Sequence, residues 1–86
     1  MQLLLTSKIW KEGKYYLAYN PELDIASQGK SFEQAEKMLK EAIDLFINTA
    51  KKMDTTKEIL KELGFIQKNK IWFPPKVLIS PIELKI

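Results

Sequence analysis

Residues 31–53 read SFEQAEKMLKEAIDLFINTAKKM and set the architecture of the whole chain. Ser31 followed three residues later by Gln34 has the form of a capping box, in which each side chain bonds the backbone of the other residue at a helix start. Apolar residues then recur at spacings of three and four, which is typical of one buried helix face. They are Phe32, Ala35, Met38, Leu39, Ala42, Ile43, Phe46, Ile47, Ala50 and Met53. The opposite face is charged, so the stretch predicts a long amphipathic helix packed on a sheet.

Three short β-strands are predicted before this helix. Residues 2–10 are rich in leucine and isoleucine, residues 15–19 are aromatic, and residues 23–27 alternate apolar and polar side chains. The strands are separated at a polar segment that contains Gly13 and at Pro21, because proline cannot donate to a central ladder. Sequential strands with such short connections predict an antiparallel meander.

A shorter helix and one more strand are predicted after the long helix. Residues 55–58, Thr-Thr-Lys-Glu, offer a second capping box, and Gly64 is placed to end that helix in a left-handed conformation. Residues 77–84 are apolar on both sides of Pro81 and predict a final strand, with the proline at an edge or a bulge. The expected fold is α+β, one domain over residues 1–86, in the order β-β-β-α-(α)-β: an antiparallel three-stranded meander, a packed helix and a C-terminal strand.

The composition excludes most enzyme chemistry. The 86 residues include no cysteine and no histidine, so disulfides, thiolate metal ligands and every imidazole-dependent nucleophile are excluded. The fourteen basic residues are all lysine, and the net charge is +3. Arginine, the preferred side chain for bidentate phosphate and base-edge contacts, does not occur. The lysines are dispersed among acidic residues, which indicates a solvated surface.

Carboxylates do not converge in the predicted fold. A metal-dependent nuclease would need about four of them around two magnesium ions. The first three strands carry only Glu12, Glu22 and Asp24, and the helix carboxylates lie on its polar face. We therefore expect no catalytic residue, no metal site and no cofactor.

No segment predicts a membrane or secretory protein. No apolar run reaches the roughly 18 residues needed to span a bilayer. The apolar start at residues 1–5 is too short for a signal peptide and has no basic region before it. A cytoplasmic location without a membrane partner is the expectation.

The run from Tyr16 to Ala35, YLAYNPELDIASQGKSFEQA, with Lys40-Glu41-Ala42-Ile43 further along, resembles the HicB-like antitoxin family. That family combines an aromatic strand, a Pro-Glu-Leu turn, a short strand ending in Ser-x-Gly, and a helix with two Glu-Ala or similar pairs. Here Gln34-Ala35 stands in place of the first pair, and Glu41-Ala42 supplies the second. The similarity covers residues 8–47 and extends only loosely beyond them.

The resemblance implies a degenerate ribonuclease-H-like fold and a partner protein. That partner is a small HicA-like toxin that cleaves mRNA and whose RNA-binding surface the antitoxin covers. Family members often carry a C-terminal DNA-binding segment, but this chain ends after its last predicted strand. We therefore expect a single HicB-like domain, no separate DNA-binding domain and no nucleic acid bound by the protein alone. Two alternatives stay open: a small nucleic-acid-binding protein, and a catalytically dead ribonuclease-H-like oligomeric scaffold.

Turn, cap and packing roles explain several positions of the motif without any function. Gly29 frees the backbone to turn from strand into helix. Ser31 caps the helix, and Ala35 and Ala42 let it lie close against the sheet. The structural set is Pro21, Gly29, Ser31, Ala35, Ala42 and Gly64.

Aromatic residues are the candidates for partner binding. Strand alternation puts Tyr15, Leu17 and Tyr19 on one face and Tyr16 and Ala18 on the other, so one set lies under the helix and the other points outward. Exposed aromatic side chains are typical of interfaces. The partner-binding candidates are Trp10, Tyr15, Tyr16, Trp72 and Phe73.

The C-terminal third offers two further hypotheses. Trp72 and Phe73 pack inside the monomer or act as anchors in another chain, and residues 68–72 could instead stack on single-stranded RNA. An apolar terminal edge strand invites pairing with a second copy, which predicts a homodimer or higher oligomer. The predicted dimer interface is Val77, Leu78, Ile79, Ile82 and Leu84.

Overall fold

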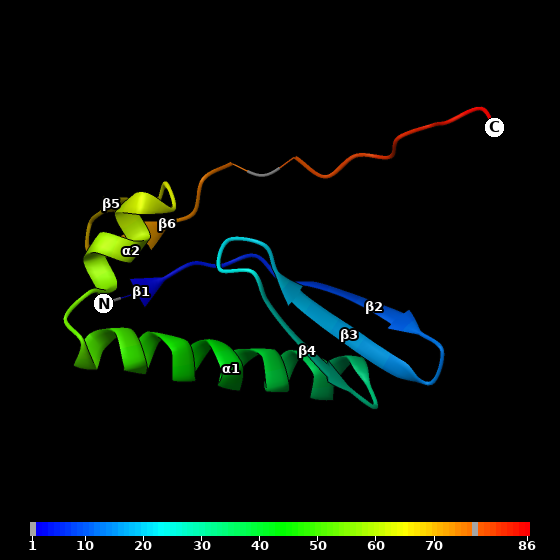
Figure 1. The fold of residues 1–86 in the computed structure, drawn as a ribbon, viewed down its shortest axis with the longest axis horizontal. Helices are drawn as coiled ribbons and strands as arrows, with labels where there is room; N and C mark the ends of the chain where they lie inside the picture. The colour runs from blue at the N-terminus through cyan, green and yellow to red at the C-terminus, as the bar shows by residue number, and fades with distance from the viewer. Residues whose placement is uncertain (1, 77) are drawn as a thin grey trace.

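The computed structural model describes residues 2–76 and 78–86 as an α+β fold (Figure 1). The elements are β1 (Gln2–Leu3), β2 (Lys8–Glu12), β3 (Tyr15–Asn20), β4 (Ile25–Gly29), α1 (Phe32–Lys52), α2 (Thr56–Glu62), β5 (Ile66–Lys68) and β6 (Ile71–Phe73). The described strands form two sheets, with the orders β2-β3-β4 and β1-β6-β5.

Helix α1 begins where its capping box predicts. Ser31 has an extended backbone, with φ −150° and ψ 167°, and its hydroxyl accepts a hydrogen bond from the Gln34 amide at 3.0 Å. The Gln34 side chain in turn accepts a bond from the Lys30 amide, one residue before the cap. Lys51 and Lys52 lie in the last turn, where positive charge suits the helix dipole. The predicted long helix and its cap are confirmed.

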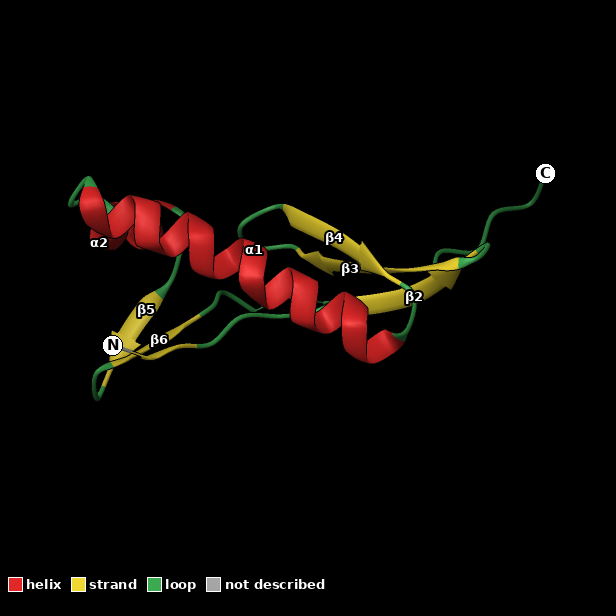
Figure 2. Cartoon of the chain, turned by 90° about the horizontal axis from the view of Figure 1, so that it is seen from below, coloured by secondary structure: helices red, strands yellow, loops and turns green. Residues whose placement is uncertain are grey.

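The meander β2-β3-β4 is antiparallel throughout and lies against α1 (Figure 2). Ala18 in β3 is directly opposite Ile9 in β2 and Ser27 in β4. Its side chain is fully buried with Ala35 and Leu39 of α1. This core forms because period-two alternation turns one strand face toward the apolar stripe of the helix. The predicted meander is confirmed.

Gly29 is needed for a close approach between β4 and α1. A Cβ at this position would lie 2.6 Å from the Ala35 amide nitrogen, which is backbone and cannot move aside. Its φ is not in the left-handed region, unlike those of Gly13 and Gly64. Gly29 was expected to supply backbone freedom, and this reason was wrong. Glycine is needed here because a side chain would clash with the backbone of α1. Ala35 lies close against the sheet as predicted, whereas Ala42 is half-buried at the flank of the helix, outside the sheet-facing core.

The first predicted strand, residues 2–10, is divided in the structure. β1 pairs parallel with β6, whereas β2 pairs antiparallel with β3 in the other sheet. β6 also pairs antiparallel with β5, and this small sheet adds strands that the sequence did not predict. The division occurs because the first part of this leucine-rich segment pairs with β6 and the last part pairs with β3. Residues 4–7 consequently link the two sheets as an extended connector.

Helix α2 closes a second core at the far end of α1. Thr55 makes no side-chain cap bond; its hydroxyl donates to the Ala50 carbonyl at 3.4 Å, so the second predicted capping box was wrong. Gly64 has φ 89° and ends the helix as predicted. The chain then returns to bury Leu60, Phe65 and Trp72 together, with two leucines of the N-terminal segment packed against them.

The predicted final strand was wrong within the described residues. Residues 78–84 form no strand, every one of them is exposed, and Figure 1 shows this segment passing the meander on the side away from α1. Pro81 lacks the amide hydrogen that a ladder needs, and an apolar segment becomes a strand only beside a free edge. Val77 of the predicted segment lies outside the described residues.

Candidate protein-binding surface

The meander face opposite α1 is covered by no element in residues 2–76 and is lined by aromatic side chains. We call Trp10, Leu17, Tyr15 and Tyr19 the aromatic face. Trp10 lies directly across from Leu17, and Tyr15 and Tyr19 lie two residues to either side on β3. Tyr15 keeps 48% and Trp10 36% of its surface exposed. Two of the predicted partner-binding residues are therefore accessible side by side.

Tyr16 belongs to the opposite, helix-covered face. Its ring packs against Phe32 at the start of α1, with centroids 4.5 Å apart and planes tilted by 59°. It also borders the core of Ala18 and Leu39, and the Lys11 ammonium lies 5.8 Å from its ring centroid. Tyr16 is therefore half-buried on the helix-covered face and does not lie beside Trp10 and Tyr15, and its role in partner binding stays a prediction.

Polar groups hold the rings of the aromatic face in place. The Trp10 indole nitrogen donates to the Glu12 carboxylate at 3.4 Å, and the Tyr19 hydroxyl donates to Asp24 at 2.9 Å. The Lys8 ammonium lies 5.3 Å from the Trp10 ring centroid, within cation–π range. The aromatic rings thus form an apolar surface with two carboxylates, Glu12 and Asp24, and one ammonium group, Lys8, beside them.

The hydrogen bond from Tyr19 to Asp24 raises the pKa of that phenol above 10.0, with desolvation and the Asp24 charge adding to the effect. The pKa of Tyr19 is raised only in the folded chain, where the ionised phenol is disfavoured. The hydrogen bond of the neutral phenol therefore stabilises the fold fully below pH 10.0, and this contribution is lost as the pH rises through the raised pKa. We expect Asp24→Asn to bring the pKa of Tyr19 down toward 10.0. Asparagine tolerates the positive φ of residue 24, so the turn persists. Titration of the Tyr19 ring by NMR checks this, and an unchanged pKa would contradict it.

A buried polar cluster positions the turn that carries Asp24. The fully buried Asn20 side chain donates to the Thr6 carbonyl at 2.7 Å and to the Glu22 carboxylate at 2.8 Å. It also accepts from the Leu23 amide at 2.8 Å, and the Thr6 amide donates to Glu22 at 2.7 Å. The sequence did not single out Asn20. Its place directly before Pro21, at the end of a strand, is the one local indication of a side chain that fixes a turn.

Trp72 is not available to a partner in this structure. Only 2% of its surface is exposed, because β6 turns it into the second core with Leu60 and Phe65. Phe73, the next residue, points outward beside Ile66 at a small hollow. Trp72 therefore lies in the core and Phe73 at the surface. The hypothesis that residues 68–72 stack on RNA needs an exposed Trp72, which this structure does not provide.

The predicted dimer residues Leu78, Ile79, Ile82 and Leu84 are all exposed. They lie on the segment that passes the meander on the side away from α1 (Figure 1). Neither of the two cores of the described residues includes these side chains.

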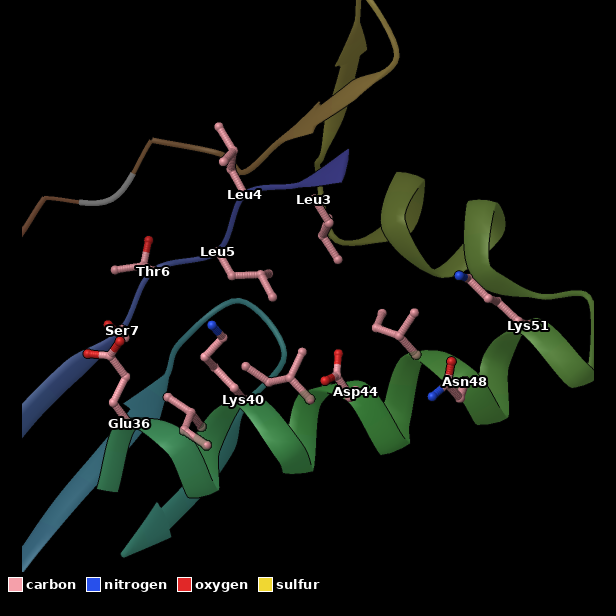
Figure 3. Close-up of a pocket in the computed structure, with 13 residues that line it drawn as sticks. Leu3, Leu4, Leu5, Thr6, Ser7, Glu36, Lys40, Asp44, Asn48 and Lys51 are labelled. Atoms are coloured by element: carbon pink, nitrogen blue, oxygen red, sulfur yellow. The ribbon is translucent and has the colours of Figure 1, made fainter. Parts of the chain in front are cut away.

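A groove of about 540 Å³ separates the connector of residues 4–7 from α1 (Figure 3). Leu3 and Leu5 point into it, while Leu4 points away. Charged residues of α1, among them Glu36, Lys40 and Asp44, share its lining with apolar ones. The groove therefore has an apolar floor with charges of both signs.

The carboxylates do not gather into a metal site within residues 2–76 and 78–86. Glu22, one of the three strand carboxylates considered from the sequence, is engaged by Thr6 and Asn20 instead. None of the described helices is both long and apolar enough to cross a bilayer. Comparisons of the chain with protein-family models, curated proteins and solved structures gave no match in any of the three.

Proposed function

We propose that this chain is a non-catalytic, cytoplasmic binding protein of the HicB-like antitoxin type. It neutralises a HicA-like toxin, which cleaves mRNA, by covering the RNA-binding surface of that toxin. The observation that carries the proposal is the aromatic face, an accessible platform on a sheet that α1 supports from behind. The resemblance of residues 8–47 to HicB-like antitoxins supplies the identity of the partner.

The chemistry of the aromatic face suits a protein that binds RNA. Tryptophan and tyrosine give large contact areas at low cost in side-chain entropy and dominate the affinity of many interfaces. An RNA-binding surface is basic, and Glu12 and Asp24 lie beside the rings of Trp10 and Tyr19. Stacking rings next to fixed negative charges are complementary to the surface that would otherwise hold bases and phosphates.

A degenerate ribonuclease-H-like fold is part of the same proposal. Support comes from the parallel pairing of β1, which precedes α1 in the sequence, with β6, which follows it. β1 and β2 belong to two separate sheets, which residues 4–7 connect, so the support is limited to the order of the elements and to this parallel pair. In this proposal the fold serves as a scaffold for the aromatic face and performs no cleavage.

One observation favours a second candidate, binding of single-stranded nucleic acid. Exposed Trp10 lies under the Lys8 ammonium, and bases stack on such rings while lysine contacts phosphate. This function requires an electrophoretic shift of RNA or DNA that weakens steeply with salt. Absence of a shift at low ionic strength removes it.

We expect Trp10→Ala and Tyr15→Ala each to weaken toxin binding by roughly 30-fold or more, since a central aromatic contact contributes about 2 kcal/mol or more. The measurement is calorimetric titration with the protein encoded by the neighbouring gene. Leu63→Ala is the matched control, because Leu63 is as exposed as Trp10 but lies at the C-cap of α2. Equal losses for all three variants would place the interface elsewhere.

A further inference from the structure

The C-terminal segment, residues 78–86, carries aliphatic side chains that its own chain leaves uncovered. Leu78 is 89% and Leu84 77% exposed, and Ile79, Ile82 and Ile86 are comparably open. In the described part of the chain, no hydrogen bond joins this segment to the body. Before the segment, Pro75 lies beside Gly64, where a Cβ added to the glycine would be 3.7 Å from the proline side chain.

A second uncovered apolar surface lies on the flank of α1. We call it the flank hollow: it is about 480 Å³ in volume and is lined by Ile25, Ala42, Leu45, Phe46, Thr49, Ala50, Met53, Thr55 and Ile59. Leu45 is 70% and Met53 68% exposed. Positions 42, 45, 46, 49 and 53 follow helical spacing, so α1 has this stripe in addition to the one that its own sheet covers.

The flank hollow adjoins a free sheet edge. β4 is an outer strand of the meander, so one side of its backbone faces no strand in the described residues. Ile25, the first residue of β4, also lines the hollow. A strand added beside β4 would turn alternate side chains toward α1 and the others toward solvent.

The end of the chain has the pattern that such a strand requires. Ile82, Leu84 and Ile86 alternate with Glu83 and Lys85. In the added strand the three aliphatic residues enter the flank hollow, and the two charged residues face water. A charged edge of this kind also discourages further strands from pairing with it.

We propose that residues 82–86 of one copy add as a strand beside β4 of a second copy and fill its flank hollow. The second copy does the same in return, which gives a two-fold symmetric dimer. The segment of the same chain is poorly placed for this, because in Figure 1 it lies on the side of the meander away from α1. Pro74 and Pro75 stiffen the path at the point where it leaves β6.

The area available matches a stable dimer. A large aliphatic side chain hides on the order of 60–120 Å² of apolar area on full burial. Three such residues on each of two segments, together with the surfaces that receive them, hide on the order of 700–1,400 Å² of apolar area, which reaches the lower part of the range of standard specific interfaces. No residue of the segment or of the flank hollow is one of the four residues of the aromatic face.

The test is the oligomeric state of the full chain alone, by sedimentation equilibrium and light scattering. We expect a dimer of twice the 10.0 kDa chain mass. Leu84→Glu and Leu45→Glu should each raise its dissociation constant by about 100-fold, because each places a charge inside the interface. Leu84→Glu combined with Leu45→Lys should recover at least about tenfold of that loss, since opposite charges then meet. Lys85→Glu is the matched control on the solvent side, and it should leave the dimer intact.

Three outcomes would overturn the proposal. One is a wild-type chain that stays monomeric at about 100 μM. Another is a dimer whose affinity Leu84→Glu and Leu45→Glu leave unchanged. The third is a monomer in which the amides of residues 82–86 are protected from hydrogen exchange, since the segment would then cover its own chain. Toxin binding is measured separately through Trp10, so failure of the dimer leaves the proposed function to its own test.

Discussion

Replacing Trp72 by alanine is expected to lower the free energy of unfolding by about 3–5 kcal/mol. The indole is 98% buried between Leu60 and Phe65, and it joins β6 to α2. Total stability for a chain of this size is about 4–13 kcal/mol, so the loss is a large part of the whole. Urea denaturation followed by circular dichroism measures it.

The neighbouring residue provides the control for that experiment. Phe73→Ala removes an aromatic ring from the same strand, but this ring points outward and is more than one-third exposed. We expect it to cost less than about 1 kcal/mol. Equal losses from Trp72→Ala and Phe73→Ala would contradict the orientation of β6.

Replacing Gly29 by alanine is expected to destabilise the protein by about 1–3 kcal/mol, because the new methyl group meets the backbone of Ala35. The midpoint of thermal unfolding should fall by on the order of 10 °C for a chain of this length. Calorimetry measures this shift. The sign is decisive, because alanine at a glycine with ordinary backbone angles and free space stabilises by about 0.4–1 kcal/mol. A raised midpoint would mean that β4 and α1 do not approach each other this closely.

The sequence predicted correctly those elements that depend on residues close to one another along the chain. The capping box of Ser31 and Gln34 and the helical spacing that follows it define α1, and short connections define the meander. Period-two alternation also separated Tyr15, Leu17 and Tyr19 from Tyr16 and Ala18. It could not tell which set the helix covers, because both faces of β3 are apolar and the choice depends on packing between elements.

Features that depend on distant partners were not predictable in this way. Trp72 is buried because β6 pairs with β1, about seventy positions earlier in the chain, and no local pattern encodes that pairing. The same pairing divides the leucine-rich segment 2–10 between two sheets. Residues 78–84 have strand propensity, but β-structure also needs a neighbouring strand, and these residues pair with none of the outer strands of their own chain.

The fold explains how so small a chain can hold the aromatic face in a fixed arrangement. α1 supports the meander from one side, and the hydrogen bonds of Asn20 and Glu22 fix the turn beside Tyr19. The aromatic residues therefore keep their positions without a partner, and less entropy is lost when one binds. Gly29→Ala should consequently weaken toxin binding as well as stability, since it disturbs the contact between helix and sheet.

The most direct measurement is RNA cleavage by the protein encoded next to this chain, with increasing amounts of the chain added. We predict that cleavage stops at a stoichiometric ratio of the two proteins, and that Trp10→Ala requires a large excess to reach the same inhibition. Undiminished cleavage in the presence of a micromolar excess, or cleavage of RNA by the purified chain itself, would contradict a function based on a binding surface alone.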